Sequence, residues 1–217
     1  SRPATLGRCP QSLLRGVPDM LASALPFALQ KDETDAAMIL IRHGQTLFNV
    51  HFGATRRDPG IEDPGLTDAG RAQAAAAAAA LAEEDVAELV VSPYRRTLET
   101  AAIIAAELDL PVSVEPLIRE RMGYACDIGT LRSELATLWP MHALDHLDER
   151  WWHHEDEPEA LLQARCETFR LRMADREDWR RVAVVTHWGV IRALTGRTVQ
   201  NGAIVRYDPT GRTLPLD

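Results

Sequence analysis

Runs of apolar residues alternate along most of the chain with segments of helical spacing. The apolar runs, rich in β-branched residues, predict strands at Met38–Arg42, Glu88–Val91, Pro111–Pro116, Val182–Thr186 and Ala203–Tyr207. The segments between them predict helices at Asp68–Glu84, Pro93–Leu108, Leu131–Trp139, Glu159–Ala174 and Val190–Thr195. Strands that alternate with helices predict an α/β fold, in which a mostly parallel sheet lies between two layers of helices as a three-layer α/β/α sandwich.

Local signals place the starts of two of these helices. Thr67 is a suitable N-cap, and Asp68 in the following turn has the charge that a helix N-terminus favours. Ser92 followed by Pro93 predicts a second N-cap, with proline at the first helical position. The alanine run 74–80 repeats the best helix former, and its small side chains allow close packing on a sheet.

Residues 1–36 differ from the rest of the chain. Basic residues precede the first acid at Asp19, prolines recur, and a charged segment follows at 31–35. A targeting segment is one interpretation, but the apolar stretch near Leu21–Leu29 is short and contains Pro26. We therefore expect an N-terminal arm or extension over residues 1–36 and one domain over residues 37–217.

Composition narrows the classes of partner. The chain has 217 residues, of which 46% are hydrophobic, and its net charge is −8, which does not suggest a nucleic-acid or membrane partner. No apolar run is long enough to predict a transmembrane helix. Cys9, Cys126 and Cys166 are widely spaced and odd in number, so we expect reduced thiols and a cytoplasmic protein. The oligomeric state is open, and a homodimer is compatible with the sequence.

Candidate catalytic residues follow three of the predicted strands. Arg42 and His43 follow the first strand, and His187 follows the fourth. Arg95 and Arg96 fall in the first turn of a predicted helix, where cations are unfavourable unless an anion binds there. Ligands bind at the carboxyl ends of strands in open α/β sheets, and arginine can hold two phosphate oxygens at once. Two arginines and two histidines around one dianion predict a phosphoryl-transfer pocket that holds no metal.

The order of these motifs resembles that of the histidine phosphatase superfamily, the group related to cofactor-dependent phosphoglycerate mutase. Its Arg-His-Gly signature matches 42–46 together with Asn49, and its Leu-Thr-x-x-Gly helix start matches 66–70. Its Ser-Pro-Leu-x-Arg element is similar to 92–96, which aligns Arg96 rather than Arg95 with the second phosphate-binding arginine. The second histidine segment is similar to 186–194, although Trp188 stands where many members have glycine.

The resemblance implies a phosphoglycerate mutase-like fold and a two-step reaction through a phosphohistidine at His43. The phosphate-binding residues that it implies are Arg42, Thr46, Asn49, Arg96 and His187. It also implies that Glu120 is the general acid and base. Arg119 and Arg121 flank Glu120 and would favour its ionised form if they pointed inward, so Asp127 is a second candidate for the acid.

Other residues allow simpler interpretations. His142 and His146 have the spacing of a helical metal pair but lack a zinc-protease framework, so we predict no metal and no cofactor. Trp151 and Trp152 either cover the pocket or pack on a helix. Arg95 is expected at the surface. Side chains that select the substrate are expected between 124 and 152 and around 50–62.

The predicted function is hydrolysis of a small phosphorylated metabolite by a metal-independent phosphomonoesterase. A mutase would use the same residues, but family mutases usually carry a longer insert than the segment between Pro116 and Val182. A non-catalytic module that binds a phosphorylated ligand is the alternative from another class. A Rossmann nucleotide site is not supported, because no G-x-G-x-x-G follows a strand.

Overall fold

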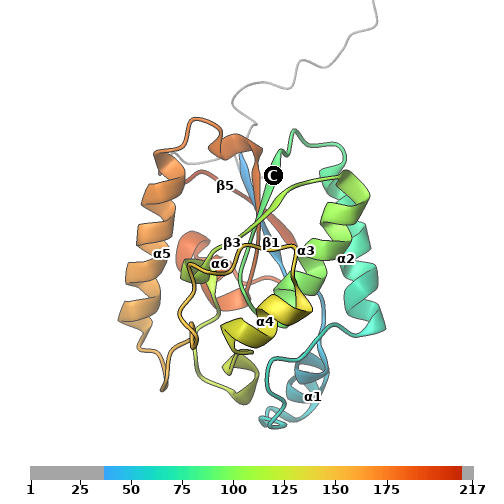
Figure 1. The fold of residues 1–217 in the computed structure, drawn as a ribbon, viewed down its shortest axis with the longest axis vertical. Helices are drawn as coiled ribbons and strands as arrows, with labels where there is room; N and C mark the ends of the chain where they lie inside the picture. The colour runs from blue at the N-terminus through green and yellow to red at the C-terminus, as the bar shows by residue number, and fades with distance from the viewer. Residues whose placement is uncertain (1–36, 212–217) are drawn as a thin grey trace, which may run out of the picture. The chain divides into compact units, whose positions relative to one another are not determined.

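The computed structural model describes residues 37–211, which form a five-stranded sheet between helices (Figure 1). The sheet order is β3-β2-β4-β1-β5, and only β5 runs antiparallel to its neighbour. The strands are β1 (Met38–Arg42), β2 (Glu88–Val91), β3 (Val112–Val114), β4 (Val182–Thr186) and β5 (Ile204–Tyr207). The predicted mostly parallel sheet is therefore confirmed.

Alternate residues of the central strands face opposite layers of helices, as the period of a strand requires. Ile39 and Ile41 of β1 pack with α2 (Asp68–Leu81) and α3 (Arg95–Leu108). Met38 and Leu40 pack instead with α5 (Glu159–Ala174) and α6 (Trp188–Thr195). Figure 1 shows these two helix pairs on opposite sides of the sheet. The three-layer sandwich is confirmed, and both faces of its sheet are buried.

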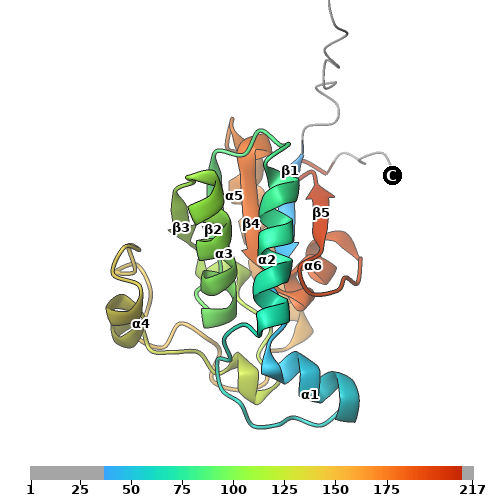
Figure 2. The same cartoon turned by 90° about the vertical axis from the view of Figure 1, so that its right-hand side faces the viewer.

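The carboxyl ends of β1, β2 and β4 lie at one end of the sheet, because these strands are parallel. Figure 2 shows α1 (Leu47–Thr55) at this end, directly after β1, with α4 (Arg132–Leu138) set apart in the connection between β3 and α5. Residues from three strand ends therefore converge in one place, as the sequence predicts.

The structure contains every predicted strand and helix, with some differences at their ends, and one further α-helix. Helix α1 was not predicted, and α2 ends at Leu81 rather than Glu84. Thr67 caps α2 as predicted, since its hydroxyl accepts a hydrogen bond from the Gly70 amide. The predicted Ser92 cap is wrong: α3 begins at Arg95 with Tyr94 at the N-cap, and the Ser92 hydroxyl bonds a histidine instead.

Other sequence-based expectations have mixed outcomes. Cys126 and Cys166 are buried free thiols, as expected. The expected N-terminal arm, the targeting alternative and Cys9 lie outside the described residues. Between residues 37 and 211, no helix is both long and apolar enough to cross a membrane.

Candidate active site

His43 and His187 lie side by side because each follows one of two neighbouring parallel strands. Arg42 of β1 is in register with Thr186 of β4, so the residues that come next meet beyond the sheet. The His43 amide donates to the Thr186 carbonyl at 3.0 Å. The centres of the two imidazole rings are 5.3 Å apart. The structure therefore brings together the two histidines that the sequence singled out.

Within residues 37–211, the His43 ring has a hydrogen-bond partner at one nitrogen and none at the other. Its Nδ1 lies 2.7 Å from the Gly44 carbonyl, which can only accept, so Nδ1 carries the proton and Nε2 keeps its lone pair. Burial lowers the pKa of His43 well below its usual value, and the charges of Arg96 and Arg42 lower it further. A neutral imidazole with an unprotonated Nε2 in a cavity is a nucleophile.

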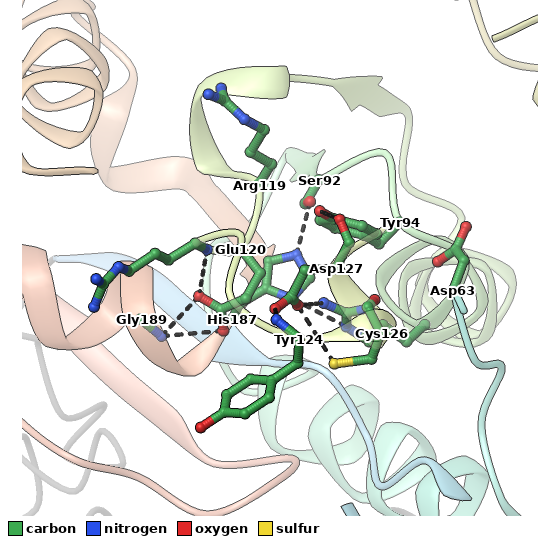
Figure 3. Close-up of polar contacts among 12 residues, drawn as sticks. Asp63, Ser92, Tyr94, Arg119, Glu120, Tyr124, Cys126, Asp127, His187 and Gly189 are labelled. Carbon is green, nitrogen blue, oxygen red and sulfur yellow. Dashed lines mark hydrogen bonds and ion pairs between the residues drawn. The ribbon is translucent and has the colours of Figure 1, made fainter. Parts of the chain in front are cut away.

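His187 has protein partners at both ring nitrogens (Figure 3). Arg96 Nε donates to Nδ1 at 3.3 Å, so Nε2 carries the proton and donates to Ser92 Oγ at 2.8 Å. Burial, followed by the charge of Arg96, lowers the pKa of His187 well below its usual value. The neutral His187 ring thus orients Arg96. The predicted contact between His187 and phosphate stays a prediction.

Two buried guanidinium groups supply positive charge beside His43. Arg42 Nη1 donates to the Val199 carbonyl at 2.7 Å, whereas its buried Nε has no hydrogen-bond partner in the described part of the chain. Arg96 is almost fully buried and donates from Nη1 to the Cys126 carbonyl at 2.6 Å. Burial lowers the pKa of Arg42, but an arginine remains charged at any working pH. Both side chains line the same cavity as His43.

Asp127 is the acid nearest to this positive charge. Its Oδ1 lies 3.1 Å from Arg96 Nη2, and both side chains are only 3% exposed. Burial raises the pKa of Asp127 to about 6, against the opposing effect of Arg96. The carboxylate also accepts a hydrogen bond from the Tyr124 amide at 3.1 Å. Ionised Asp127 therefore offsets the charge of Arg96, and protonation of Asp127 would weaken this pair.

Glu120 lies at the same cavity, at the N-terminus of α6. The Gly189 amide lies 3.2 Å from each of its carboxylate oxygens, and the Arg121 amide donates to Oε1 at 2.8 Å (Figure 3). Free amides and the helix dipole hold a carboxylate at this position. The side chain is thus fixed on the lining of the cavity that His43 also lines.

The side chains of the two arginines that flank Glu120 bind other groups. Arg119 pairs with Glu157 at 3.3 Å, and Figure 3 shows its side chain extending away from Glu120. Arg121 donates to the Glu157 carbonyl at 2.7 Å and pairs with Glu159 at 3.1 Å. Both guanidinium groups are therefore paired with acids other than Glu120, and neither forms an ion pair with it among the described residues.

Thr46 and Asn49 line the cavity but also bond each other. Thr46 is the N-cap of α1, and Asn49 Oδ1 accepts from the Thr46 amide and hydroxyl, each at 3.0 Å. This reciprocal capping box fixes the helix that follows the Arg-His-Gly segment. Their predicted contact with phosphate stays a prediction.

The cavity has a volume of about 770 Å³, and its wall beyond the charged residues is partly aromatic. Phe48 and Phe52 of α1 lie on this wall with Tyr124, and Trp188 of α6 lines it too. Phe52 and Tyr124 fall within the two segments expected to select the substrate. Phe48 and Trp188 were missed, although each stands close in sequence to a catalytic candidate.

The remaining candidates fall outside the cavity. Trp151 and Trp152 are buried in the hydrophobic core with α3, which favours the packing interpretation. Arg95 lies at the surface and pairs with Glu99, as expected. His142 and His146 lie in turns after α4, and among residues 37–211 no cluster of three potential metal ligands occurs.

Comparison with known proteins agrees with the motifs. The family model for the histidine phosphatase superfamily (branch 1) matches residues 38–205. No curated protein matches the chain. Among solved structures, mycobacterial hydrolase 1 is 26% identical with a TM-score of 0.57, and the match covers 78% of this chain and 89% of that one.

Two further solved structures are similar. Mycobacterial glucosyl-3-phosphoglycerate phosphatase, in its complex with VO3, is 25% identical over 78% of this chain and 89% of its own, with a TM-score of 0.56. YhfR of Bacillus stearothermophilus is 27% identical over 74% of this chain and 78% of its own, with a TM-score of 0.54. The predicted phosphoglycerate mutase-like fold is thereby confirmed.

Proposed function

We propose that this chain, which belongs to the histidine phosphatase superfamily (branch 1), is a phosphomonoesterase that hydrolyses small organic phosphates through His43. One observation carries the proposal: the Gly44 carbonyl holds His43 Nδ1, which leaves Nε2 free in a cavity lined by Arg42, Arg96 and Glu120. The mycobacterial relative named as a phosphatase supports hydrolysis as the class of reaction.

In the first step, His43 Nε2 attacks phosphorus, and the bond from phosphorus to the ester oxygen breaks. Glu120 donates a proton to that oxygen as it leaves. Arg42 Nε, which has no partner within the described residues, donates to a phosphoryl oxygen, as does Arg96. Thr46 and Asn49 line the same cavity and complete the phosphate site, and His187, whose ring nitrogens bind Arg96 and Ser92, positions Arg96 for it.

In the second step, Glu120 is ionised and takes a proton from water, and the oxygen of that water attacks the phosphohistidine. The nitrogen–phosphorus bond breaks, and inorganic phosphate leaves. The amides of Gly189 and Arg121 contact Glu120 oxygens and keep its side chain in place. The protein needs no metal in this scheme, because the arginines offset the phosphoryl charge.

Hydrolysis of 4-nitrophenyl phosphate at pH of about 5 to 8 in the presence of EDTA tests the proposal. We expect turnover that His43→Ala abolishes. The matched control is His51→Ala, since His51 is an exposed residue of α1 outside the cavity, and it should retain the wild-type rate. Turnover that survives His43→Ala would refute the assignment of the nucleophile, and no turnover in the wild type would favour the mutase or binding-module alternatives.

Substitution of Glu120 tests its role as general acid. Glu120→Gln should slow the hydrolysis of an alkyl phosphate by about 10²- to 10⁴-fold, because an alkoxide leaves poorly without a proton. It should slow 4-nitrophenyl phosphate much less, since that leaving group is stable as an anion. The comparison uses kcat/KM for the two esters, because this quantity reports the steps up to departure of the alcohol and excludes the phosphohistidine hydrolysis that both esters share. Equal losses would remove Glu120 from the acid role and favour Asp127.

A further inference from the structure

The mouth of the cavity carries an aromatic wall that the proposed chemistry does not use. Phe48 and Phe52, four residues apart on α1, stack with ring centres 5.4 Å apart. The Tyr124 ring closes the group, at 5.6 Å from Phe48 and 5.0 Å from Phe52. All three rings line the cavity.

Burial distinguishes this wall from ordinary core packing. Phe48 is buried, but Tyr124 is 45% exposed, and the other aromatic side chain that stays so open, Trp188, is 37% exposed. Within residues 37–211, these are the two aromatic members of the set of exposed large hydrophobic side chains. Both line the same cavity, so the exposed aromatic surface is concentrated where a substrate enters.

Two guanidinium groups at the cavity extend this flat surface. Arg56 lies 5.9 Å from the centre of the Phe52 ring, and Arg192 lies 5.4 Å from the centre of the Trp188 ring. Both arginines line the cavity and are exposed. Guanidinium planes stack on aromatic faces, whereas they gain little from an aliphatic chain. The surface therefore favours a flat ring over a puckered or flexible apolar group.

The wall has a fixed position relative to the phosphate site. Helix α1 starts at the capping box that directly follows the Arg-His-Gly segment, which sets Phe48 and Phe52. The Tyr124 amide bonds Asp127, whose carboxylate contacts Arg96 (Figure 3). Figure 3 also shows the Tyr124 ring extending away from this buried pair. A leaving group attached to a phosphoryl group at His43 and Arg96 can thus contact the wall.

We propose that the preferred substrates are phosphate monoesters whose alcohol carries a planar aromatic ring, such as a nucleobase or an aryl group, bound by Phe48, Phe52 and Tyr124. This inference rests on the proposed phosphatase activity. It places small hydrophilic phosphates, such as phosphoglycerate, among the poorer substrates.

Three esters of similar leaving-group basicity test the inference: 2-phenylethyl, 2-cyclohexylethyl and ethyl phosphate. We expect kcat/KM for the phenyl ester to exceed that for the cyclohexyl ester by about three- to tenfold, the range that aromatic pairing supports beyond area burial. Ethyl phosphate should be the poorest of the three. Equal kcat/KM for the phenyl and cyclohexyl esters would overturn the inference and indicate an unselective apolar wall.

Variants of Tyr124 connect the preference to the wall. Tyr124→Leu should lower kcat/KM for the phenyl ester about three- to tenfold more than for ethyl phosphate, and Tyr124→Phe should keep the preference. The control is Leu161→Ala, because Leu161 is 48% exposed on α5 and lies outside the cavity. A preference unchanged in Tyr124→Leu would overturn the assignment of the wall.

Hydrolysis of 4-nitrophenyl phosphate, measured alongside the three test esters, separates this inference from the proposed function on which it rests. An enzyme that hydrolyses 4-nitrophenyl phosphate but does not distinguish the three alkyl esters would retain the proposed function and lose the aromatic subsite. No turnover of any of the four esters would overturn the proposed function and the subsite with it.

Discussion

At the scale of single residues, several groups at the site bind the same guanidinium, that of Arg96. Arg96 is shared between Asp127, the Cys126 carbonyl and His187, yet the proposed reaction also needs it for phosphate. A bound anion and the Asp127 carboxylate repel each other, so anion binding favours protonation of Asp127. Because its pKa already lies at about 6, this proton is taken up near neutral pH.

Anion affinity should therefore depend on pH through Asp127. Sulfate is a suitable probe, because it stays a dianion over this range and is not hydrolysed. Anion binding raises the pKa of Asp127 above 6, so sulfate affinity should rise as pH falls from about 8 towards 6 and level off below, by at most about tenfold per pH unit. Titration calorimetry measures this. Burial lowers the pKa of His43 and of His187 well below the usual value, so both rings are neutral before sulfate binds.

Asp127→Asn isolates the contribution of this carboxylate. The amide cannot ionise, so sulfate affinity should no longer vary with pH and should be higher than in the wild type at pH of about 8. A variant that keeps the wild-type pH dependence would show that another group binds the proton.

At the scale of elements, the site depends on a close contact between the His43 loop and helix α2. A Cβ on Gly70 would lie 2.2 Å from the Gln45 carbonyl oxygen, and a Cβ on Gly44 would lie 2.3 Å from the Gly70 oxygen. The Thr67 amide also donates to the Gln45 carbonyl at 2.9 Å. The first turn of α2 is thus packed directly on the backbone that follows the nucleophile.

Gly70→Ala should separate these two backbones. We expect a loss of about 1–3 kcal/mol in the free energy of unfolding, as in other overpacked sites, together with lower kcat as the His43 loop shifts. The control is Gly53→Ala in α1, where an added Cβ meets no atom within 4 Å and should be neutral or stabilise by up to about 1 kcal/mol. Urea denaturation and 4-nitrophenyl phosphate kinetics compare the two, and equal behaviour would contradict the contact.

The elements that the sequence predicts well are those with strong local patterns. The apolar runs of β1 and β4 allowed us to predict two central strands and the proximity of His43 to His187. The Thr67 cap allowed us to predict the start of α2. Helix α1 was missed because its apolar residues do not form one buried face: Leu47 is 54% exposed while Phe48 is buried.

Residues whose partners are distant in sequence could not be placed from local patterns. Ser92 is of a residue type that often caps helices, but its hydroxyl contacts His187, which follows β4. The directions of Arg119 and Arg121 depend on Glu157, on the far side of the connection between β3 and α5. Residue spacing and helix signals do not predict such contacts, because the contacts form only when distant parts of the chain fold together.

At the scale of the whole molecule, a buried ion pair between Arg165 and Glu157 joins the loop that carries Glu120 to helix α5. Arg165 binds both carboxylate oxygens of Glu157 at 2.8 Å and donates to the carbonyls of Leu117 and Arg119 at 2.7 Å. The Glu157 amide in turn donates to the Met122 carbonyl at 2.9 Å. The loop that carries Glu120 is therefore held on both sides by one buried pair.

Arg165→Lys tests whether this pair positions Glu120, since lysine keeps the charge but cannot reproduce the fork of hydrogen bonds. Leaving Glu157 incompletely paired should cost up to about 3–5 kcal/mol in the free energy of unfolding. Because Glu120 then loses its fixed position, kcat/KM for an alkyl phosphate should fall more than kcat/KM for 4-nitrophenyl phosphate, which is a weaker form of the effect expected for Glu120→Gln. The control is Arg172→Lys on the same helix, where the arginine side chain is 60% exposed. This substitution should change neither the relative rates of the two esters nor the free energy of unfolding. If Arg165→Lys loses stability but slows both esters equally, the pair supports the fold without positioning the acid.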